Sequence, residues 1–483
     1  MKKFDVAIIG AGMAGMLAAI ELRKQGYKNL VLFEKADNVG GTWRENSYPG
    51  LTCDVPAHHY TYSFARNPNW SQTYASGPEI QKYFESIYKS HNLKECIQFN
   101  SEVSKLAFDG EYWTLEFLEQ EAVEAKVVIA ATGVLHHPKI PTLTSQDTFQ
   151  GKQFHSAKWD TDLSLENLRV GVIGNGSSGI QIVSALAKEA REVFHFQRTA
   201  QWMMPLENPS FSNEQKLAFK DPELLAQAMD FEGYAAAVDR YSHALIDMNS
   251  EAANEMAMYC QMNLDRVMDP ELKKLLTPDH KPLCKRLIWS SDYYDAIQQP
   301  NTHLITDSIS YINQTGIVTD AETIDLDVIV YATGFDTSMF MRPINILGLN
   351  GITLEDYWQD YPKAYYSIAM PNFPNLFMLN GPNGPVGNFS LIDIAEQQMQ
   401  YIAQLIKLLL QGQAKYIHPK TDATNKYEIA RETAAKKTVW YLGGCNSWYL
   451  NSAGIPASWP WTYGRFVEAM QKPSLEDFEV VSN

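Results

Sequence analysis

A glycine-rich loop pattern, G-x-G-x-x-G, occurs twice in this chain of 483 residues. Its glycines are Gly10, Gly12 and Gly15 in the first copy, and Gly174, Gly176 and Gly179 in the second. Each copy follows a short apolar run, Phe4–Ile9 or Arg169–Ile173, that predicts a buried parallel strand, and each leads into a predicted helix. Glycines at this spacing allow a tight turn and a close approach of the backbone to a pyrophosphate, while the helix N-terminus attracts its charge. The chain is therefore predicted to be an α/β protein with two Rossmann-like dinucleotide-binding units.

The residue that ends the second predicted strand differs between the two units. Glu34 lies 34 − 10 = 24 residues after the first glycine of its motif, and Arg198 lies 198 − 174 = 24 residues after the first glycine of the other. A carboxylate at this offset accepts hydrogen bonds from a ribose diol, whereas a guanidinium binds a 2′-phosphate. We therefore expect FAD in the first unit and NADPH in the second, with Ser177 and Thr199 as further contacts. A solvated surface charge is the alternative for Arg198.

A second glycine-rich stretch, Gly40–Trp43, reads G-G-T-W. Adjacent glycines beside a tryptophan indicate backbone that lies close to a flat ring system. Gly41, Thr42 and Trp43 are therefore predicted to bind the flavin, together with Tyr60; a surface loop rich in turn residues is the alternative. Near the C-terminus, the loop 380–385 precedes a predicted helix over 389–411, whose N-terminus would stabilise negative charge on a reduced flavin.

The segment between the two units carries the pattern F-x-G-x-x-x-H-x-x-x-W-D. Its residues are Phe149, Gly151, His155, Trp159 and Asp160. Because it lies between two nucleotide sites, we expect it to act as a hinge that couples their relative motion, with His155 as a hydrogen-bonding residue rather than a proton shuttle. The triplet Ala-Thr-Gly occurs at 131–133 and again at 332–334, and Asp336, just after the second copy, is a further predicted cofactor contact.

The length of the chain is too great for one ordinary core and predicts more than one domain. We expect an FAD-binding domain from residues 1–145 and 325–483, an NADP-binding domain from 146–210 and 281–324, and a helical insert over 211–280. The insert is rich in methionine, and its methionines are interpreted as adaptable core filler, with a flexible wall of a substrate channel as the alternative.

Composition excludes several classes of protein. The formal net charge of −16 disfavours nucleic acid as a partner. The five cysteines form no C-x-x-C pair, which predicts a reducing cytoplasm without a disulfide framework, a thiol redox centre or a cysteine zinc site, and no metal is expected. No apolar run approaches the ~20 residues of a membrane span.

Taken together, these motifs resemble those of the type I Baeyer-Villiger monooxygenases, which are related to flavin-containing monooxygenases. The resemblance covers nearly the whole chain in the right order, and Trp159-Asp160 is its most specific part. By this resemblance Arg286 is the catalytic arginine, Lys285 and Arg198 contact the 2′-phosphate, and Asp54 is an acidic partner beside the flavin. The pair Leu283-Cys284 departs from the glycine often found before Lys-Arg in that family.

The resemblance implies a reaction as well as a fold. NADPH would reduce FAD, O2 would be captured as a flavin peroxide, and that peroxide would attack a ketone to give an ester or lactone. Arg286 would stabilise the developing negative charge, because a guanidinium stays cationic and offers a planar fork of donors, and Asp54 would orient it. A structural ion pair is the alternative for Arg286, and a loop-capping carboxylate for Asp54.

Three other activities remain open at the level of sequence. One is oxygenation of sulfur or nitrogen in place of a ketone. Another is electron transfer by a two-nucleotide reductase, which would normally carry a redox cysteine pair. The last is nucleotide binding without turnover, by a regulatory protein.

Overall fold

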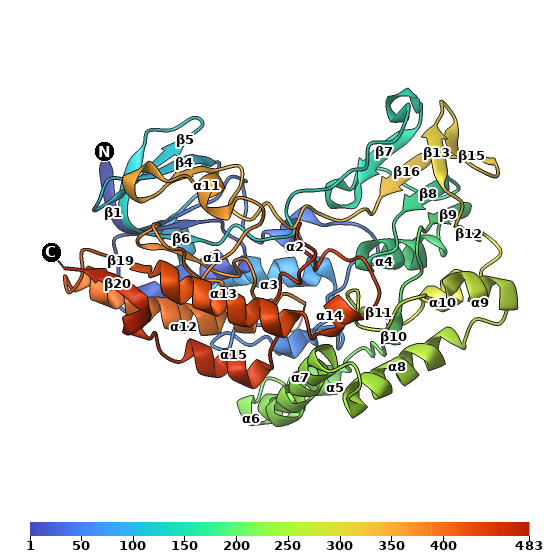
Figure 1. The fold of residues 1–483 in the computed structure, drawn as a ribbon. Helices are drawn as coiled ribbons and strands as arrows, with labels where there is room; N and C mark the ends of the chain where they lie inside the picture. Colours follow the sequence, from blue (N-terminus) through green and yellow to red (C-terminus); the bar gives the residue numbers. More distant parts are fainter. Residues whose placement is uncertain (388, 483) are drawn as a thin grey trace.

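The structure is a computed structural model that describes residues 1–387 and 389–482. It contains two bodies side by side, each built around one large sheet, with a row of helices along their lower side (Figure 1). The prediction of an α/β protein with two nucleotide-binding units and a helical insert is confirmed. In the described part of the chain, no helix combines the length and apolar character needed to cross a membrane.

The first sheet is mixed and has eight strands in the order β17-β4-β5-β6-β1-β2-β3, with β18 also paired to β6. Its strands are β1 (Lys2–Ile9), β2 (Leu30–Phe33), β3 (Ile97–Gln98), β4 (Val103–Phe108), β5 (Trp113–Phe117), β6 (Val123–Ala130), β17 (Asn345–Leu347) and β18 (Leu376–Met378). The central strands β6, β1, β2 and β3 run parallel, whereas β4 and β5 form an antiparallel hairpin.

The helices and cores of the first body explain why these strands are so apolar. Its helices are α1 (Met13–Lys24), α2 (Thr42–Glu45), α3 (Gly77–Ser90), α11 (Leu354–Trp358), α12 (Leu391–Leu410), α13 (Thr421–Ala435), α14 (Val439–Leu442) and α15 (Tyr463–Met470). Val6 and Ile8 pack into a core with α1, α3 and α12, while Ala7 and Ile9 pack into a second core on the opposite face. Both faces of β1 are thus buried, as its continuous apolar run predicts.

The second sheet has five parallel strands in the order β12-β9-β8-β16-β7. They are β7 (Lys152–His155), β8 (Arg169–Ile173), β9 (Glu192–Phe196), β12 (Thr302–Ile305) and β16 (Val328–Tyr331). The helices α4 (Ser177–Leu186) and α10 (Tyr293–Ala296) accompany it, and a small antiparallel sheet of β13 (Ile309–Ile312), β14 (Gly316–Thr319) and β15 (Thr323–Asp325) adjoins it.

The pairing of strand β16 shows that the expected domain boundary at residue 325 lies too early in the chain. Residues from 325 onward were assigned to the first domain, but β16 pairs with β7 and β8 in the second sheet. The chain therefore returns to the first body only after Tyr331. A buried apolar strand has the same composition in either sheet, so local sequence does not indicate which sheet it joins.

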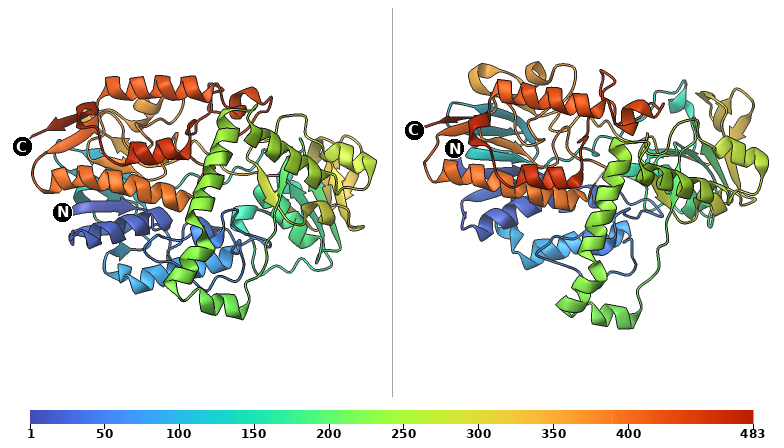
Figure 2. Two further views of the ribbon diagram at one scale, coloured as in Figure 1. Left: turned by 90° about the horizontal axis from the view of Figure 1, so that it is seen from below. Right: turned by 60° about the horizontal axis from the view of Figure 1, so that its bottom comes forward.

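The helical insert lies along the lower side of both bodies (Figure 1), and Figure 2 shows α7 crossing the space between them. It consists of α5 (Asn213–Ala218), α6 (Pro222–Met229), α7 (Phe231–Ile246), α8 (Glu251–Leu264) and α9 (Pro270–Leu276). Helix α7 contacts α14 and α15 of the first body, whereas α8 contacts β10 (Met203–Pro205), which pairs with β11 (Ile288–Ser290). The remaining strands, β19 (Tyr416–Pro419) and β20 (Phe478–Val481), pair near the C-terminus.

The methionines of the insert divide between core and surface. Met229 is buried, and Met248 and Met256 are half-buried against a core shared with α14. Met258, Met262 and Met268 are exposed. The interpretation as core filler therefore holds for only some of them.

Candidate active site between the two nucleotide loops

The two glycine loops are built alike. The first glycine of each has a positive φ, +100° at Gly10 and +110° at Gly174. A Cβ on Gly10 would lie 2.6 Å from the carbonyl oxygen of Ala131, and one on Gly174 would lie 2.4 Å from that of Ala332. In both units the third glycine packs on the carbonyl oxygen of the first. The two Ala-Thr-Gly turns therefore have the same structural role: each follows a neighbouring strand and packs against the glycine loop of its unit.

The middle glycines lie at the starts of α1 and α4. Gly12 and Gly176 occupy the N-cap positions, and the first turns that follow carry no acidic residue. A Cβ on Gly41, in the G-G-T-W stretch, would lie 3.1 Å from the Cα of Gly12, so the two loops approach each other closely. Helix N-termini that lack a side-chain cap leave backbone N–H groups for an anion. These donors and this close approach fit a pyrophosphate in each unit.

Glu34 lies at the end of β2, where a ribose is expected. Its side chain accepts hydrogen bonds from the backbone N–H groups of Ala11 (2.7 Å) and Ala36 (2.9 Å), and an Arg44 nitrogen lies 3.4 Å away. These contacts hold the carboxylate beside the first glycine loop. A carboxylate accepts about four hydrogen bonds, so Glu34 keeps capacity for a ribose hydroxyl.

Arg198, Thr199 and Lys285 form a polar cluster at the end of β9. Lys285 Nζ donates to Thr199 Oγ1 at 2.8 Å, and Asn175 of the glycine loop donates to the Thr199 carbonyl at 2.7 Å. Burial lowers the pKa of Lys285, an effect that nearby Arg198 strengthens and Asp279 opposes. Two cationic side chains thus lie together where a 2′-phosphate is expected.

Trp43 and Tyr60 form the aromatic part of the first site. Trp43 Nε1 donates to the Tyr60 hydroxyl at 3.1 Å, and the rings meet edge to face at 5.5 Å. Gly40 donates to the Ala11 carbonyl at 3.1 Å and so ties this stretch to the glycine loop, and Thr42 is exposed beside it. These contacts place Trp43 and Tyr60 close to the first glycine loop, and their contact with a flat ring system stays a prediction.

Arg286 and Asp54 form an ion pair. The guanidinium of Arg286 donates through Nη2 to Asp54 Oδ2, and the two side chains are 30% and 27% exposed. The Asp54 carboxylate raises the pKa of Arg286 above its usual value. Solvent therefore still reaches a charge pair that is otherwise enclosed by protein, as a reaction site requires.

The loop that carries Asp54 is docked on the second body. Gln181 of α4 donates to the Thr52 carbonyl at 3.1 Å, and the Tyr48 hydroxyl donates to Gln181 at 3.1 Å. Burial raises the pKa of Tyr48 to about 12, so the hydroxyl stays protonated. Asp54 thus belongs to the first body in sequence but is positioned by both.

The turn before Lys285 contains a disulfide bond that the sequence did not predict. The prediction that the chain forms no disulfide is wrong, because Cys284 and Cys445 are joined by one. The two cysteines are 161 residues apart, so no spacing rule identifies the pair. Leu283, where the family often has glycine, is buried with φ +69°, and its apolar packing compensates for a backbone conformation that glycine adopts more readily.

The hinge segment is anchored in the second sheet. His155 is buried at the end of β7, and its Nδ1 accepts from the Ala157 N–H, which leaves Nε2 to donate to the Gly334 carbonyl at 2.9 Å. Burial lowers the pKa of His155 and favours this neutral form. Phe149 is buried nearby, and Gly151 lies against it and the Asp327 carbonyl. The segment therefore links β7 to the second Ala-Thr-Gly turn.

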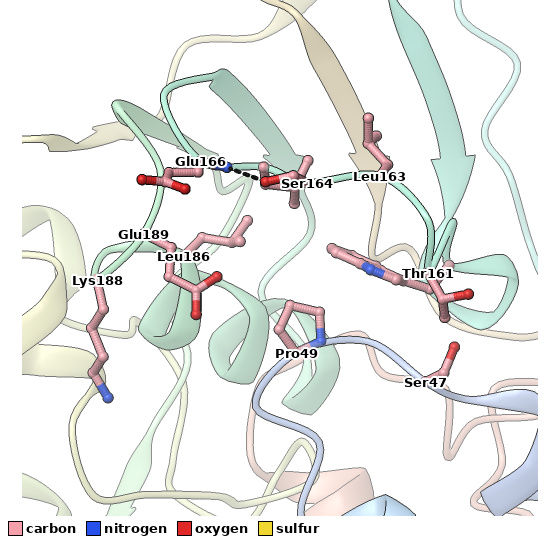
Figure 3. Close-up of a pocket in the computed structure, with 11 residues that line it drawn as sticks. Ser47, Pro49, Thr161, Leu163, Ser164, Glu166, Leu186, Lys188 and Glu189 are labelled. Atoms are coloured by element: carbon pink, nitrogen blue, oxygen red, sulfur yellow. Dashed lines mark hydrogen bonds between the residues drawn. The ribbon is translucent and has the colours of Figure 1, made fainter.

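Trp159 and Asp160 end the hinge segment beside a cavity of about 470 Å³. Figure 3 shows the cavity between Ser47 and Pro49 of the first body and residues 161–166 with the end of α4. Trp159 lines it and packs edge to face on Phe154, while Asp160 accepts from the Asp162 N–H at 3.3 Å. Its lining residues come from both bodies.

Asp336 has a local partner. Its carboxylate accepts from the backbone N–H (3.0 Å) and hydroxyl (2.6 Å) of Ser338. These bonds lower the pKa of Asp336. The Asp336 carboxylate thus stabilises its own turn by hydrogen bonds to Ser338.

Two tyrosines near Arg286 were missed by the sequence analysis. Tyr241 of α7 and Tyr449 near the C-terminus both interact electrostatically with Arg286, and burial raises the pKa of each. The ring of Tyr449 stacks on that of its neighbour Trp448. No spacing in the sequence connects Arg286 with an insert or a tail so distant along the chain.

A model of the pyridine nucleotide-disulphide oxidoreductase family matches residues 7–217. Cys53 and Cys96, the cysteines within that range, are free thiols, so the match reflects the nucleotide-binding fold. An uncharacterised monooxygenase of Mycobacterium tuberculosis (strain ATCC 25618 / H37Rv) is 44% identical over 476 residues, 98% of this chain and 96% of that protein. A Baeyer-Villiger monooxygenase of Streptomyces coelicolor is 34% identical over 482 residues, 99% of this chain and 92% of that protein.

Solved structures agree with these relatives. The closed crystal structure of cyclohexanone monooxygenase superposes with a TM-score of 0.88 at 28% identity, and oxidised steroid monooxygenase bound to NADP with 0.87 at 29%, each over 100% of both chains. The OTEMO complex with FAD and NADP gives 0.88 at 25% over 99% of both. The predicted cofactors are thereby confirmed. The chain belongs to the type I Baeyer-Villiger monooxygenases, flavoprotein enzymes that use FAD and NADPH.

Proposed function

We propose that this monooxygenase inserts one oxygen atom of O2 next to the carbonyl group of a ketone and releases an ester or lactone. Relatives named Baeyer-Villiger monooxygenase, and neighbours named for cyclohexanone and steroid oxidation, support ketones as the substrate class. Bound FAD, once reduced by NADPH, supplies the activation of O2.

One observation carries the proposal: adjacent residues of one turn reach both nucleotide sites. Lys285 bonds to Thr199 in the NADP unit, while Arg286 pairs with Asp54 beside the first unit. A movement that places one side chain therefore also places the other. An enzyme that must use NADPH first and O2 afterwards needs this kind of connection between the two sites.

The roles of the remaining residues follow from their contacts. The FAD pyrophosphate is held by backbone N–H groups at the start of α1, and its ribose by Glu34. Arg198 and Lys285 bind the 2′-phosphate of NADPH as paired cations. Trp43 and Tyr60 pack beside the ring system and exclude water from it.

Arg286 is the residue to which we assign charge stabilisation. Its guanidinium is positive at any working pH and presents several donors in one plane. Donors that are fixed before the reaction stabilise developing negative charge without reorganisation. Asp54 orients this fork and balances its charge in the resting enzyme.

Product analysis tests the proposal. The purified enzyme is supplied with NADPH, ¹⁸O2 and a panel of linear, cyclic and aryl ketones plus one thioether, and products are identified by mass spectrometry. We expect an ester or lactone that carries one ¹⁸O atom. A sulfoxide without any ester would assign the enzyme to heteroatom oxygenation instead, and NADPH oxidation that requires a protein acceptor rather than O2 would assign it to electron transfer. Reactions without NADPH are the matched control.

A further inference from the structure

The hydroxyl of Tyr449 lies near the guanidinium of Arg286, and nothing in the sequence indicated this neighbour. Arg286 interacts electrostatically with this hydroxyl, in addition to its ion pair with Asp54. Both groups lie against the same glycine, since a Cβ on Gly387 would be 2.2 Å from the Tyr449 hydroxyl and 2.8 Å from Arg286 Nη1. Gly387 lies in the loop before α12, so Arg286, Tyr449 and this loop meet at one point.

The ring of Tyr449 has little freedom to move. The side chain is buried, and it stacks on Trp448 (centroids 4.2 Å apart, planes at 28°) and packs on Trp440 (4.9 Å, 34°). The Tyr449 carbonyl accepts from the Ala457 N–H at 2.7 Å, which holds the backbone as well. A hydroxyl on so constrained a ring is a fixed hydrogen-bond acceptor.

The segment that carries Tyr449 is also joined to the turn that carries Arg286. The Cys284–Cys445 disulfide links them, and Lys281 donates to the Gly443 carbonyl at 3.0 Å. In Figure 1, α14 lies at the junction of the two bodies, just before this segment. The position of Tyr449 relative to Arg286 is therefore set by covalent and hydrogen-bonded connections, and not by one side-chain contact.

The geometry points to Tyr449 as a positioning residue for Arg286, with its hydroxyl accepting a hydrogen bond from the guanidinium. One contact, with Asp54 at Nη2, leaves the guanidinium plane free to rotate about it. A second contact, with Tyr449 at another corner of the fork, fixes the plane toward the Gly387 loop. Fixed orientation matters because a planar donor stabilises charge only when it is aimed correctly. This inference rests on the proposed role of Arg286.

Tyr449→Phe is the test, because it removes the hydroxyl and keeps the stacked ring. Tyr441→Phe, at an exposed tyrosine of α14, is the matched control. Phenylglyoxal, a dicarbonyl that modifies free guanidinium groups, is applied to each FAD-loaded enzyme, and labelling of Arg286 relative to exposed Arg191 is measured by peptide mass spectrometry. Loss of one hydrogen bond predicts labelling about threefold to tenfold faster in Tyr449→Phe, and parental labelling in Tyr441→Phe.

The second readout is how NADPH oxidation divides between ester and hydrogen peroxide. We expect Tyr449→Phe to retain FAD and its KM for the ketone, while the peroxide share rises and kcat for ester falls by about the same threefold to tenfold. Unchanged labelling of Arg286 would overturn the inference, and so would changed labelling with an unchanged peroxide share when the parent enzyme forms ester. So would loss of FAD, because the hydroxyl would then have a structural role. If the parent enzyme makes no ester while Tyr449→Phe still labels faster, the proposed function fails and the positioning of Arg286 stands.

Discussion

Replacing Arg286 with alanine separates the two halves of the proposed reaction. In the proposed reaction, hydride would pass from NADPH to FAD before O2 is used, so a residue that acts only on later negative charge would be dispensable for the first step. We expect Arg286→Ala to be reduced by NADPH without oxygen at close to the parental rate. In air it should release hydrogen peroxide and little or no ester.

The size of the loss follows from the setting of the guanidinium. The side chains of Arg286 and Asp54 are 30% and 27% exposed, so a dielectric constant between those of water and the protein interior applies. At an effective dielectric constant of about 20, the positive guanidinium and a unit negative charge about 4 Å from it would attract each other by about 4 kcal/mol. Removing one preorganised donor from an active site typically costs about 3–4 kcal/mol. Both routes predict that ester formation slows by about 10² to 10³-fold.

The assay pairs anaerobic stopped-flow measurement of flavin absorbance with analysis of ester and peroxide in air. Arg286→Lys serves as a graded variant: it keeps the charge, loses the planar fork and should fall between the parent and alanine. An Arg286→Ala enzyme that forms ester at the parental rate would refute the assignment.

Removal of Arg286 also leaves the Asp54 carboxylate unpaired, and the double variant Arg286→Ala/Asp54→Asn controls for this effect. If the missing guanidinium causes the loss, the double variant should be no more active than the single. Recovery of ester formation in the double variant would instead assign the defect to the unpaired carboxylate.

Three further predictions concern the NADP site, the hinge and the disulfide. Arg198→Ala should abolish most of a preference for NADPH over NADH of about tenfold or more, since one charge-assisted contact contributes about 1.5–3 kcal/mol, and the ratio of kcat/KM for the two cofactors measures this. His155→Ala should retain bound FAD but lose coordinated turnover, because it loses its hydrogen bond to the Gly334 turn; flavin content and ester yield measure the two effects. Cys284→Ser should lower Tm, because in entropic models a cross-link over 161 residues destabilises the unfolded chain by about 5 kcal/mol. It should also raise the peroxide share, because the disulfide joins the segments that carry Arg286 and Tyr449.

Matched substitutions on the same bodies control these predictions. Arg191→Ala removes an exposed arginine before β9 and should leave the cofactor preference unchanged. Cys96→Ser removes a free thiol and should leave Tm near the parental value. A parent that uses NADH and NADPH equally, a His155→Ala enzyme that loses its flavin, or a Cys284→Ser enzyme with parental Tm and peroxide share would contradict the respective predictions.

Much of the fold was predictable because it depends on local patterns. The strand Arg169–Ile173 was predicted with the bounds of β8. Apolar runs bounded by glycine loops specify such strands from neighbouring residues alone. The position of Glu34 beside the first glycine loop was predictable for the same reason, since both belong to one strand–helix–strand unit.

The domain boundary at 325 failed where local pattern no longer suffices. Strand β16 joins β7 and β8, whose residues lie more than 150 positions earlier, and its composition would suit either sheet. A central strand joins the sheet in which a neighbouring strand on each side completes its backbone hydrogen bonds. Those neighbours are brought beside it only when the whole chain has folded.

The sequence by itself determined the two nucleotide units, their cofactors and the residues at the strand ends, because each depends on contacts within a few tens of residues. Only the tertiary structure decided how the reaction site is assembled. Asp54 and Arg286 are 232 residues apart, and Cys284 and Cys445 are 161 apart. Tyr449 reaches Arg286 from the other end of the chain. Contacts of this range follow no period in the sequence, because they exist only once two bodies and an insert have packed together and brought side chains from separate loops to one place.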